Sequence, residues 1–219
     1  GKSTLAKDLA KKIGYTYIDS GAMYRAVALY ALRRGWVTED DIDKEALKQH
    51  IQEIHITFRT NEQGQQETYL NGENVEKEIR SLEVGNAASR ISTLDFVRRE
   101  MVRQQQEMGE EKGVVMDGRD IGTVVFPEAE LKIFLTASPE TRALRRFNEL
   151  KEQGEEVTYE EVFANIKERD ERDSNRSQSP VRKADDAIEL DNSNLTVEEQ
   201  LQWAIDMFNK KMQQICQYA

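Results

Sequence analysis

Cysteine and histidine are almost missing from this chain. Among its 219 residues there is one cysteine, Cys216, and there are two histidines, His50 and His55. A single cysteine excludes an intramolecular disulfide and a cysteine-rich metal site. Two histidines are too few for a zinc site of the usual composition. The sequence therefore predicts neither a disulfide-stapled fold nor a zinc centre.

Long apolar runs and a surplus of basic residues are missing as well. No segment approaches the roughly 20 apolar residues of a membrane-spanning helix, and no secretory signal pattern is seen. We therefore expect a cytoplasmic protein that binds no membrane. The net charge is -10, from 31 Lys and Arg against 41 Asp and Glu. Coating a nucleic acid requires the opposite balance, so we expect no nucleic-acid partner.

The chain has the composition of one globular domain, with 38% hydrophobic and 33% charged residues. Strand-like runs alternate with helical patterns, which predicts an α/β fold with a parallel sheet core flanked by helices. The expected parallel strands are 15–18, 114–117, 131–136 and 187–190, and the two central ones look buried on both faces. Residues 53–75 instead alternate apolar and polar side chains between turns, which predicts a small inserted antiparallel sheet.

The first four residues, Gly1-Lys2-Ser3-Thr4, match the second half of the phosphate-binding motif G-x-x-x-x-G-K-[ST]. In such a loop, backbone N–H groups and a helix N-terminus hold the phosphates. The lysine reaches the β- and γ-phosphates, and the Ser or Thr hydroxyl binds Mg²⁺. A helical pattern follows at once, as the motif requires, although an ordinary helix start would look the same. We expect the other half of the loop to lie before Gly1.

A second candidate phosphate site is the segment 19–25, DSGAMYR, which follows a strand-like run and opens a helix. Ser20 is the expected N-cap of this helix. Arg25 lies about a turn and a half inside it. A planar guanidinium binds phosphate through two hydrogen bonds, so Arg25 is a candidate ligand of an acceptor phosphate. A capped helix with a solvated arginine is the alternative interpretation.

Residues 117–123, DGRDIGT, directly follow an expected parallel strand. The carboxyl ends of such strands face the ligand crevice of an α/β sheet. Glycines in this position favour close approach to a ligand. Arg119 and Asp120 are therefore candidate site residues, and a structural salt-bridge cluster is the alternative.

Arginines gather between residues 142 and 176. Arg169, Asp173 and Arg176 recur at spacings that place them on one helix face. Ion pairs with neighbouring acidic residues on a solvated face would account for about half of these arginines. The same residues also suit a lid that closes over transferring phosphates and excludes water.

Taken together and in order, five motifs resemble those of the bacterial cytidylate kinases along essentially the whole chain. They are GKST, DSGAMYR, NGENVEKEIR, DGRDIGTVVFP and IKERDERDSNR. The resemblance implies the P-loop nucleoside monophosphate kinase fold in three parts. These are a CORE (1–35, 112–140 and 184–219), a monophosphate-binding subdomain (about 36–111) and a helical LID (about 141–183).

The resemblance also implies a reaction and its residues: transfer of the ATP γ-phosphoryl group to CMP or dCMP, with Mg²⁺, by a monomer. The ATP-binding residues would be Gly1, Lys2, Ser3, Thr4 and Arg142, with Ser3 on the metal. The CMP-binding residues would be Ser20, Arg25, Ser89, Arg98, Arg119, Asp120, Arg169, Asp173 and Arg176. Of these, Ser89, Arg98 and Asp120 would contact cytosine, and Arg169 and Asp173 the ribose. The catalytic residues would be Lys2, Arg119 and Arg176.

Two alternatives stay open at this point. A kinase for UMP, AMP or another small acceptor would share the P-loop and the lid. A non-catalytic P-loop binding module would need no second set of phosphate-binding arginines. An RNA-associated protein is disfavoured by the charge of -10 and by the lack of aromatic residues among the basic ones.

Overall fold

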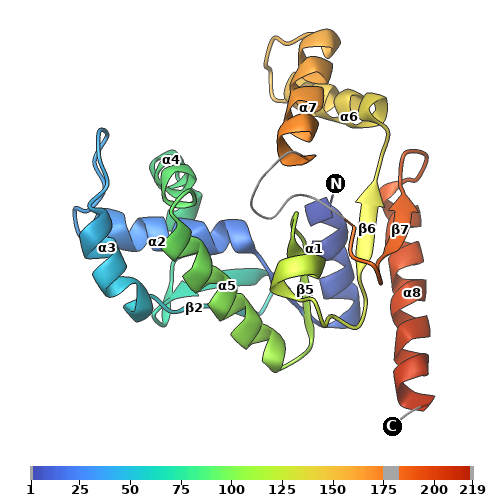
Figure 1. Ribbon diagram of the computed structural model, residues 1–219, viewed down its shortest axis with the longest axis horizontal. Helices are drawn as coiled ribbons and strands as arrows, with labels where there is room; N and C mark the ends of the chain where they lie inside the picture. Colours follow the sequence, from blue (N-terminus) through green and yellow to red (C-terminus); the bar gives the residue numbers. More distant parts are fainter. Residues whose placement is uncertain (1, 175–182, 218–219) are drawn as a thin grey trace. The chain divides into compact units, whose positions relative to one another are not determined.

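The computed structural model describes residues 2–174 and 183–217 (Figure 1). The chain forms two compact units. Unit 1 consists of Gly1–Ile13 and Asp117–Ala219, and unit 2 consists of Gly14–Met116. None of the helices in the described ranges is long and apolar enough to cross a membrane.

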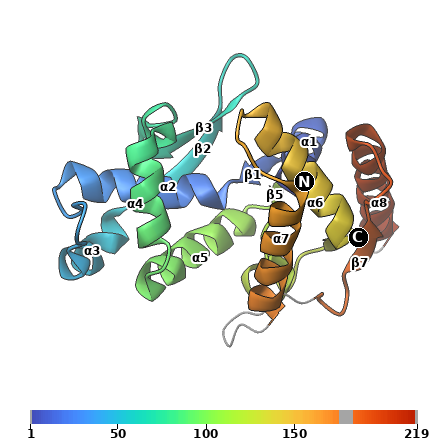
Figure 2. The same ribbon diagram turned by 90° about the horizontal axis from the view of Figure 1, so that it is seen from above.

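Unit 2 is built around α2 (Ser20–Arg33), whose side chains are buried on nearly every face. Alanines along α2 let neighbouring elements approach closely, and α4 (Leu82–Ile91) packs against it (Figures 1 and 2). Strand β1 (Thr16–Ile18) runs into α2 and pairs in parallel with β5 (Val114–Met116). Helix α5 (Asp95–Glu110) leads back to β5. The parallel pairing predicted from the sequence is confirmed.

The inserted antiparallel sheet is present in unit 2. Its order is β2-β3-β4, formed by β2 (Ile56–Thr60), β3 (Gln66–Leu70) and β4 (Glu73–Asn74). The tight turn between β3 and β4 places Asn71 and Gly72 at φ of 49° and 84°, a conformation that these two residue types tolerate best. The side-chain amide of Gln66 attaches β3 to β1, because it donates to the Tyr17 carbonyl oxygen and accepts from the Tyr17 N–H.

Two local features of unit 2 differ from expectation. The N-cap of α2 is Asp19 and not Ser20: the Asp19 side chain accepts the N–H of Ala22 at 3.0 Å, and Ser20 is the first helical residue. Both residue types cap well, so the point where the chain leaves β1 decides between them. A short helix, α3 (Lys44–His50), with a 3-10 turn after it (η1, Ile51–Glu53), was not predicted, because Leu47 is the one buried residue in its seven.

Unit 1 contains the second parallel pair, β6 (Ile133–Thr136) with β7 (Ile188–Asp191). Helix α1 (Lys2–Ile13) packs against α8 (Val197–Gln217), and α6 (Pro139–Glu152) lies beside α7 (Tyr159–Ser174) (Figure 1). Residues of β5 and β6 are half-buried, not buried on both faces as expected, and each of these strands pairs with one other strand among the described residues. The predicted α/β class, with parallel strands, flanking helices and a small antiparallel sheet, is confirmed.

Candidate active site

The start of α1 presents the hydroxyl groups of the first motif. Ser3 and Thr4 are exposed in the first turn, which contains no acidic residue, so the positive end of the helix remains available to an anion. The Ser3 hydroxyl donates a hydrogen bond of 3.2 Å to the Asp117 carboxylate, 114 positions later in the chain. Gly1 and the side chain of Lys2 lie outside the described residues.

Asp117 is a candidate site residue that the sequence predictions did not include. The signal was present, since Asp117 is the first residue after β5. A hydroxyl and a carboxylate oxygen side by side are ligands that suit Mg²⁺. No group of three or more metal-binding side chains occurs in the part of the chain that is described. The pair thus fits a Mg²⁺ ion that takes its other ligands from water and nucleotide phosphates.

Arg119 and Asp120 lie in a tightly constrained loop of unit 1. A Cβ atom on Gly118 would come within 2.8 Å of Ile121 Cγ1, so this position needs glycine unless Ile121 moves. Ile121–Val125 form one π-helical turn (η3), an element frequent at functional sites. The Asp120 carbonyl oxygen accepts from the N–H of Val124 at 2.8 Å. Asp120 is half-buried and Arg119 is exposed.

Lys132 anchors this loop and was also absent from the predictions. Its side chain is 7% exposed, and its ammonium group donates to the Pro127 carbonyl oxygen and, at 2.8 Å, to Asp186. The aliphatic stem lies against Gly122, where a Cβ would be 3.3 Å from Lys132 Cδ. The hydrogen bond from Lys132 lowers the pKa of the Asp186 carboxyl. Lys132 thus joins the π-helical turn to the residues before β7.

Arg25 is a half-buried cation of unit 2 that is available to bind an anion. Its Nη1 donates to the Ile79 carbonyl oxygen at 2.9 Å, and its guanidinium lies over Gly85 of α4. No carboxylate among the described residues pairs with it, whereas Arg33 binds both Glu73 and Glu78 at 2.8 Å. A half-buried guanidinium without an acidic partner is suited to bind an anion such as phosphate.

The other predicted acceptor-binding residues of unit 2 are Ser20, Ser89 and Arg98, and no hydrogen bond or ion pair in the part of the chain that the structure describes joins them to Arg25. Ser20 is half-buried in the first turn of α2, near Arg25 in sequence. Ser89 lies one turn after Gly85 on α4, and its hydroxyl donates to the Gly85 carbonyl oxygen at 3.2 Å. Arg98, in the first turns of α5, is half-buried and has no acidic partner in the described ranges. The structure thus brings Arg25 to the Gly85–Ser89 turn of α4.

The arginines of α6 and α7 are divided between ion pairs and open positions. Arg142 forms two parallel hydrogen bonds, 2.8 and 2.7 Å, to the carboxylate of Asp170 and so ties α6 to α7. Arg169 is exposed and has no ion-pair partner in the part of the chain that is described. The side chain of Asp173 and the whole of Arg176 lie outside the described residues. The predicted role of Arg142 in ATP binding stays a prediction.

The fold and these side chains are those of an α/β phosphotransferase that binds nucleotides. Residues 1–210 match the family model of the cytidylate kinases. The chain is 61% identical over 211 residues to a cytidylate kinase of Bacteroides thetaiotaomicron, covering 96% of this chain and 92% of the relative. A cytidylate kinase of Parabacteroides distasonis is 60% identical with the same coverage. One of Flavobacterium psychrophilum is 52% identical over 95% of this chain and 93% of the relative.

The chain therefore belongs to the cytidylate kinase family. This confirms the resemblance derived from the five motifs, and with it the assignment to the nucleotide-binding kinases. The roles given above to single residues were not tested by these comparisons and stay predictions.

Proposed function

We propose that this protein transfers the γ-phosphoryl group of ATP to CMP and dCMP, with CDP or dCDP and ADP as products. The observation that carries the proposal is the half-buried Arg25, which has no acidic partner in the described ranges and is held by the Ile79 carbonyl oxygen. A nucleotide switch or binding module needs the triphosphate site alone. A second phosphate-binding arginine, in a chain of this family, supports a kinase with a monophosphate acceptor.

On the donor side, the start of α1 would bind the ATP phosphates, with Gly1 to Thr4 as predicted. Ser3 and Asp117, joined by their 3.2 Å hydrogen bond, would hold Mg²⁺. When bound with ATP, this ion neutralises charge on the phosphates. Arg142 would assist from α6, within a lid formed by residues 141–183 between CORE segments.

On the acceptor side, Ser20 and Arg25 would bind the monophosphate at the start of α2. The attacking oxygen belongs to a phosphate that is already anionic, so no histidine is needed as a base. Catalysis is then positioning and charge neutralisation by Lys2, Arg119 and Arg176. Cytosine would be read by Ser89, Arg98 and Asp120, and the ribose by Arg169 and Asp173. The enzyme would act as a monomer on these small molecules.

The proposal is tested by ADP formation with Mg-ATP on protein that carries a complete P-loop. CMP and dCMP should be phosphorylated well and AMP poorly. Preference for UMP or AMP would keep the kinase and refute the cytosine-reading residues. Nucleotide binding without turnover on any acceptor would support a binding module instead.

A matched pair of variants tests the acceptor arginine. Arg25→Ala should raise KM for CMP at least about tenfold, because a charge-assisted hydrogen-bonding partner of the phosphate is lost, and should leave KM for ATP unchanged. Arg33→Ala removes a paired arginine from the same helix and should change neither constant. Equal kinetics of the two variants would refute the role of Arg25.

A further inference from the structure

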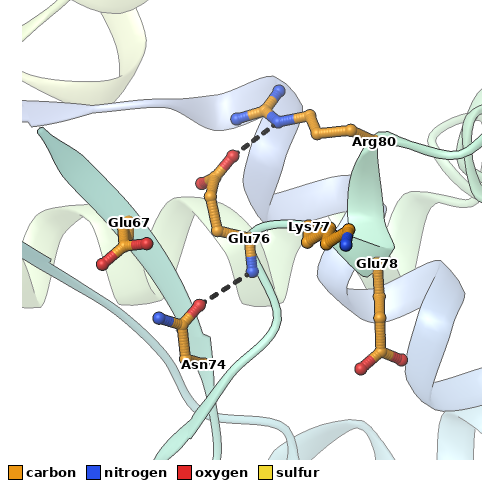
Figure 3. Close-up of a pocket in the computed structure, with 6 residues that line it drawn as sticks. All are labelled: Glu67, Asn74, Glu76, Lys77, Glu78 and Arg80. Carbon is orange, nitrogen blue, oxygen red and sulfur yellow. Dashed lines mark hydrogen bonds and ion pairs between the residues drawn. The ribbon is translucent and has the colours of Figure 1, made fainter.

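A chain of polar contacts leads from the inserted sheet to the start of α2. Thr68 of β3, which is 1% exposed, donates from its backbone N–H and its hydroxyl to one oxygen of Glu76, at 3.1 and 2.9 Å. The other oxygen of Glu76 accepts from Arg80 Nε at 2.7 Å (Figure 3). Arg80 Nη2 lies 3.6 Å from Asp19, the residue that caps α2.

The same short segment also contacts Arg25. The 3-10 turn η2 (Glu78–Arg80) contains Ile79, whose side chain is fully buried and whose carbonyl oxygen accepts from Arg25 Nη1 at 2.9 Å. Two adjacent residues thus contact the start of α2. Arg80 lies near Asp19, the N-cap residue, and the Ile79 carbonyl oxygen accepts the hydrogen bond from Arg25. The segment itself is held by Glu76.

The charges support a fixed arrangement. Burial raises the pKa of Glu76, but hydrogen bonds from Arg80 and Thr68 outweigh this and lower it, so the carboxylate is ionised. The hydrogen bond to Glu76 likewise raises the pKa of Arg80. In Figure 3, Glu76 is directed at Arg80, whereas Glu78 points away from it and instead pairs with Arg33. Arg80 is therefore occupied by carboxylates, unlike Arg25.

A second contact between α2 and the same region supplies an internal control. Arg33, at the C-terminal end of α2, binds Glu73 of β4 and Glu78 of η2, with N–O distances of 2.8 Å to each. Both ends of α2 are thus tied to residues 73–80: Arg33 binds at the C-terminal end, whereas Arg80 and the Ile79 carbonyl oxygen contact the end that carries Asp19 and Arg25. Side chains of Arg33 and Arg80 are comparably accessible, 35% and 48%.

We infer that Glu76 and Arg80 are positioning residues for the acceptor phosphate: they hold η2 against the start of α2 and thereby set the orientation of Arg25. The inference rests on the proposed function. It gives the inserted sheet a role in acceptor binding, because Thr68 fixes Glu76 and Glu76 fixes Arg80. Neither Glu76 nor Arg80 needs to touch the substrate.

The test compares Arg80→Ala, Glu76→Gln and the control Arg33→Ala in steady-state kinetics and thermal unfolding. Arg80→Ala should raise KM for CMP about fivefold to tenfold, the range expected for a hydrogen-bonded charge that is half-exposed. KM for ATP should stay unchanged, and the melting temperature should fall no further than in Arg33→Ala. Glu76→Gln should shift KM for CMP in the same direction, and Arg33→Ala should leave it within about twofold.

A double variant separates positioning from direct contact. If Arg80 acts through Arg25, then Arg80→Ala should change KM for CMP less than about twofold when Arg25 is already alanine. A full effect in that background, or a KM of Arg80→Ala equal to that of Arg33→Ala, would overturn the inference. Failure of the proposed function gives a different result, because the wild-type protein itself would then phosphorylate no CMP. That result would overturn the inference as well.

Discussion

Replacing Gly85 by alanine should stabilise the fold and weaken acceptor binding at the same time. Gly85 lies inside α4, where glycine is less favourable than alanine by about 0.5–1 kcal/mol. The variant should gain up to this free energy of unfolding. For a chain of this length the gain corresponds to a rise in melting temperature of about 1–4 °C.

The added methyl group would weaken acceptor binding because it displaces the side chain of Arg25. A Cβ at position 85 would lie 3.1 and 3.2 Å from the two terminal nitrogens of Arg25 and 3.4 Å from Cζ. The guanidinium must therefore move by a few tenths of an ångström, away from the position in which it donates to Ile79 at 2.9 Å. Loss of a hydrogen bond to a charged group is worth about 1.5–3 kcal/mol. If the shift weakens the bond from Arg25 to the acceptor phosphate by about 1 kcal/mol, KM for CMP rises about fivefold.

The assay is thermal unfolding alongside CMP saturation curves for wild type, Gly85→Ala, Arg25→Ala and the double variant. In the double variant the stability gain should remain and the effect of Gly85→Ala on KM should vanish. A higher melting temperature with an unchanged KM would show that Arg25 does not bind the acceptor from its position over Gly85. A lower melting temperature would refute the stability argument.

Three further predictions concern unit 1. Ser3→Ala and Asp117→Asn should each raise the Mg²⁺ concentration for half-maximal activity about tenfold, because the first removes an oxygen ligand and the second the negative charge of a carboxylate ligand; unchanged Mg²⁺ titrations would exclude the pair. Lys132→Met should lower the free energy of unfolding by about 1–2 kcal/mol in urea titrations, because the Pro127 carbonyl oxygen loses its donor; an equal midpoint would contradict this. Lys132 lowers the pKa of Asp186, so this carboxyl stabilises the fold above its unfolded pKa of about 3.9 and the effect fades as pH falls through the folded value. Asp186→Asn should therefore be less stable than wild type at neutral pH and approach it in acid, and a pH-independent difference would refute the linkage.

Much of the local structure follows from the sequence because it depends on nearby residues. The alternation of Ile54, Ile56 and Phe58, with turns at Gly64 and Gly72, was enough to predict the inserted sheet. The helical pattern after Asp19 placed Arg25 on a helix that begins where a parallel strand ends. The family could also be predicted from the sequence, because the prediction rests on the order and spacing of five motifs, and the family model confirms it.

What the sequence could not decide are contacts between residues far apart in the chain. Ser3 forms a hydrogen bond with Asp117, which is 114 positions later in the chain. Arg80 lies near Asp19 and is bound by Glu76, which in turn accepts a hydrogen bond from Thr68 of the inserted sheet. Whether an arginine forms an ion pair likewise depends on its tertiary neighbours. Arg142 is hydrogen-bonded to Asp170 on another helix, whereas the guanidinium of Arg25 lies beside Gly85. Charge and periodicity are properties of a segment, but the partner of a charge is set by the packing of whole elements. The sequence by itself therefore determined the family and most helices and strands, and the tertiary structure decided which side chains are free to bind phosphate.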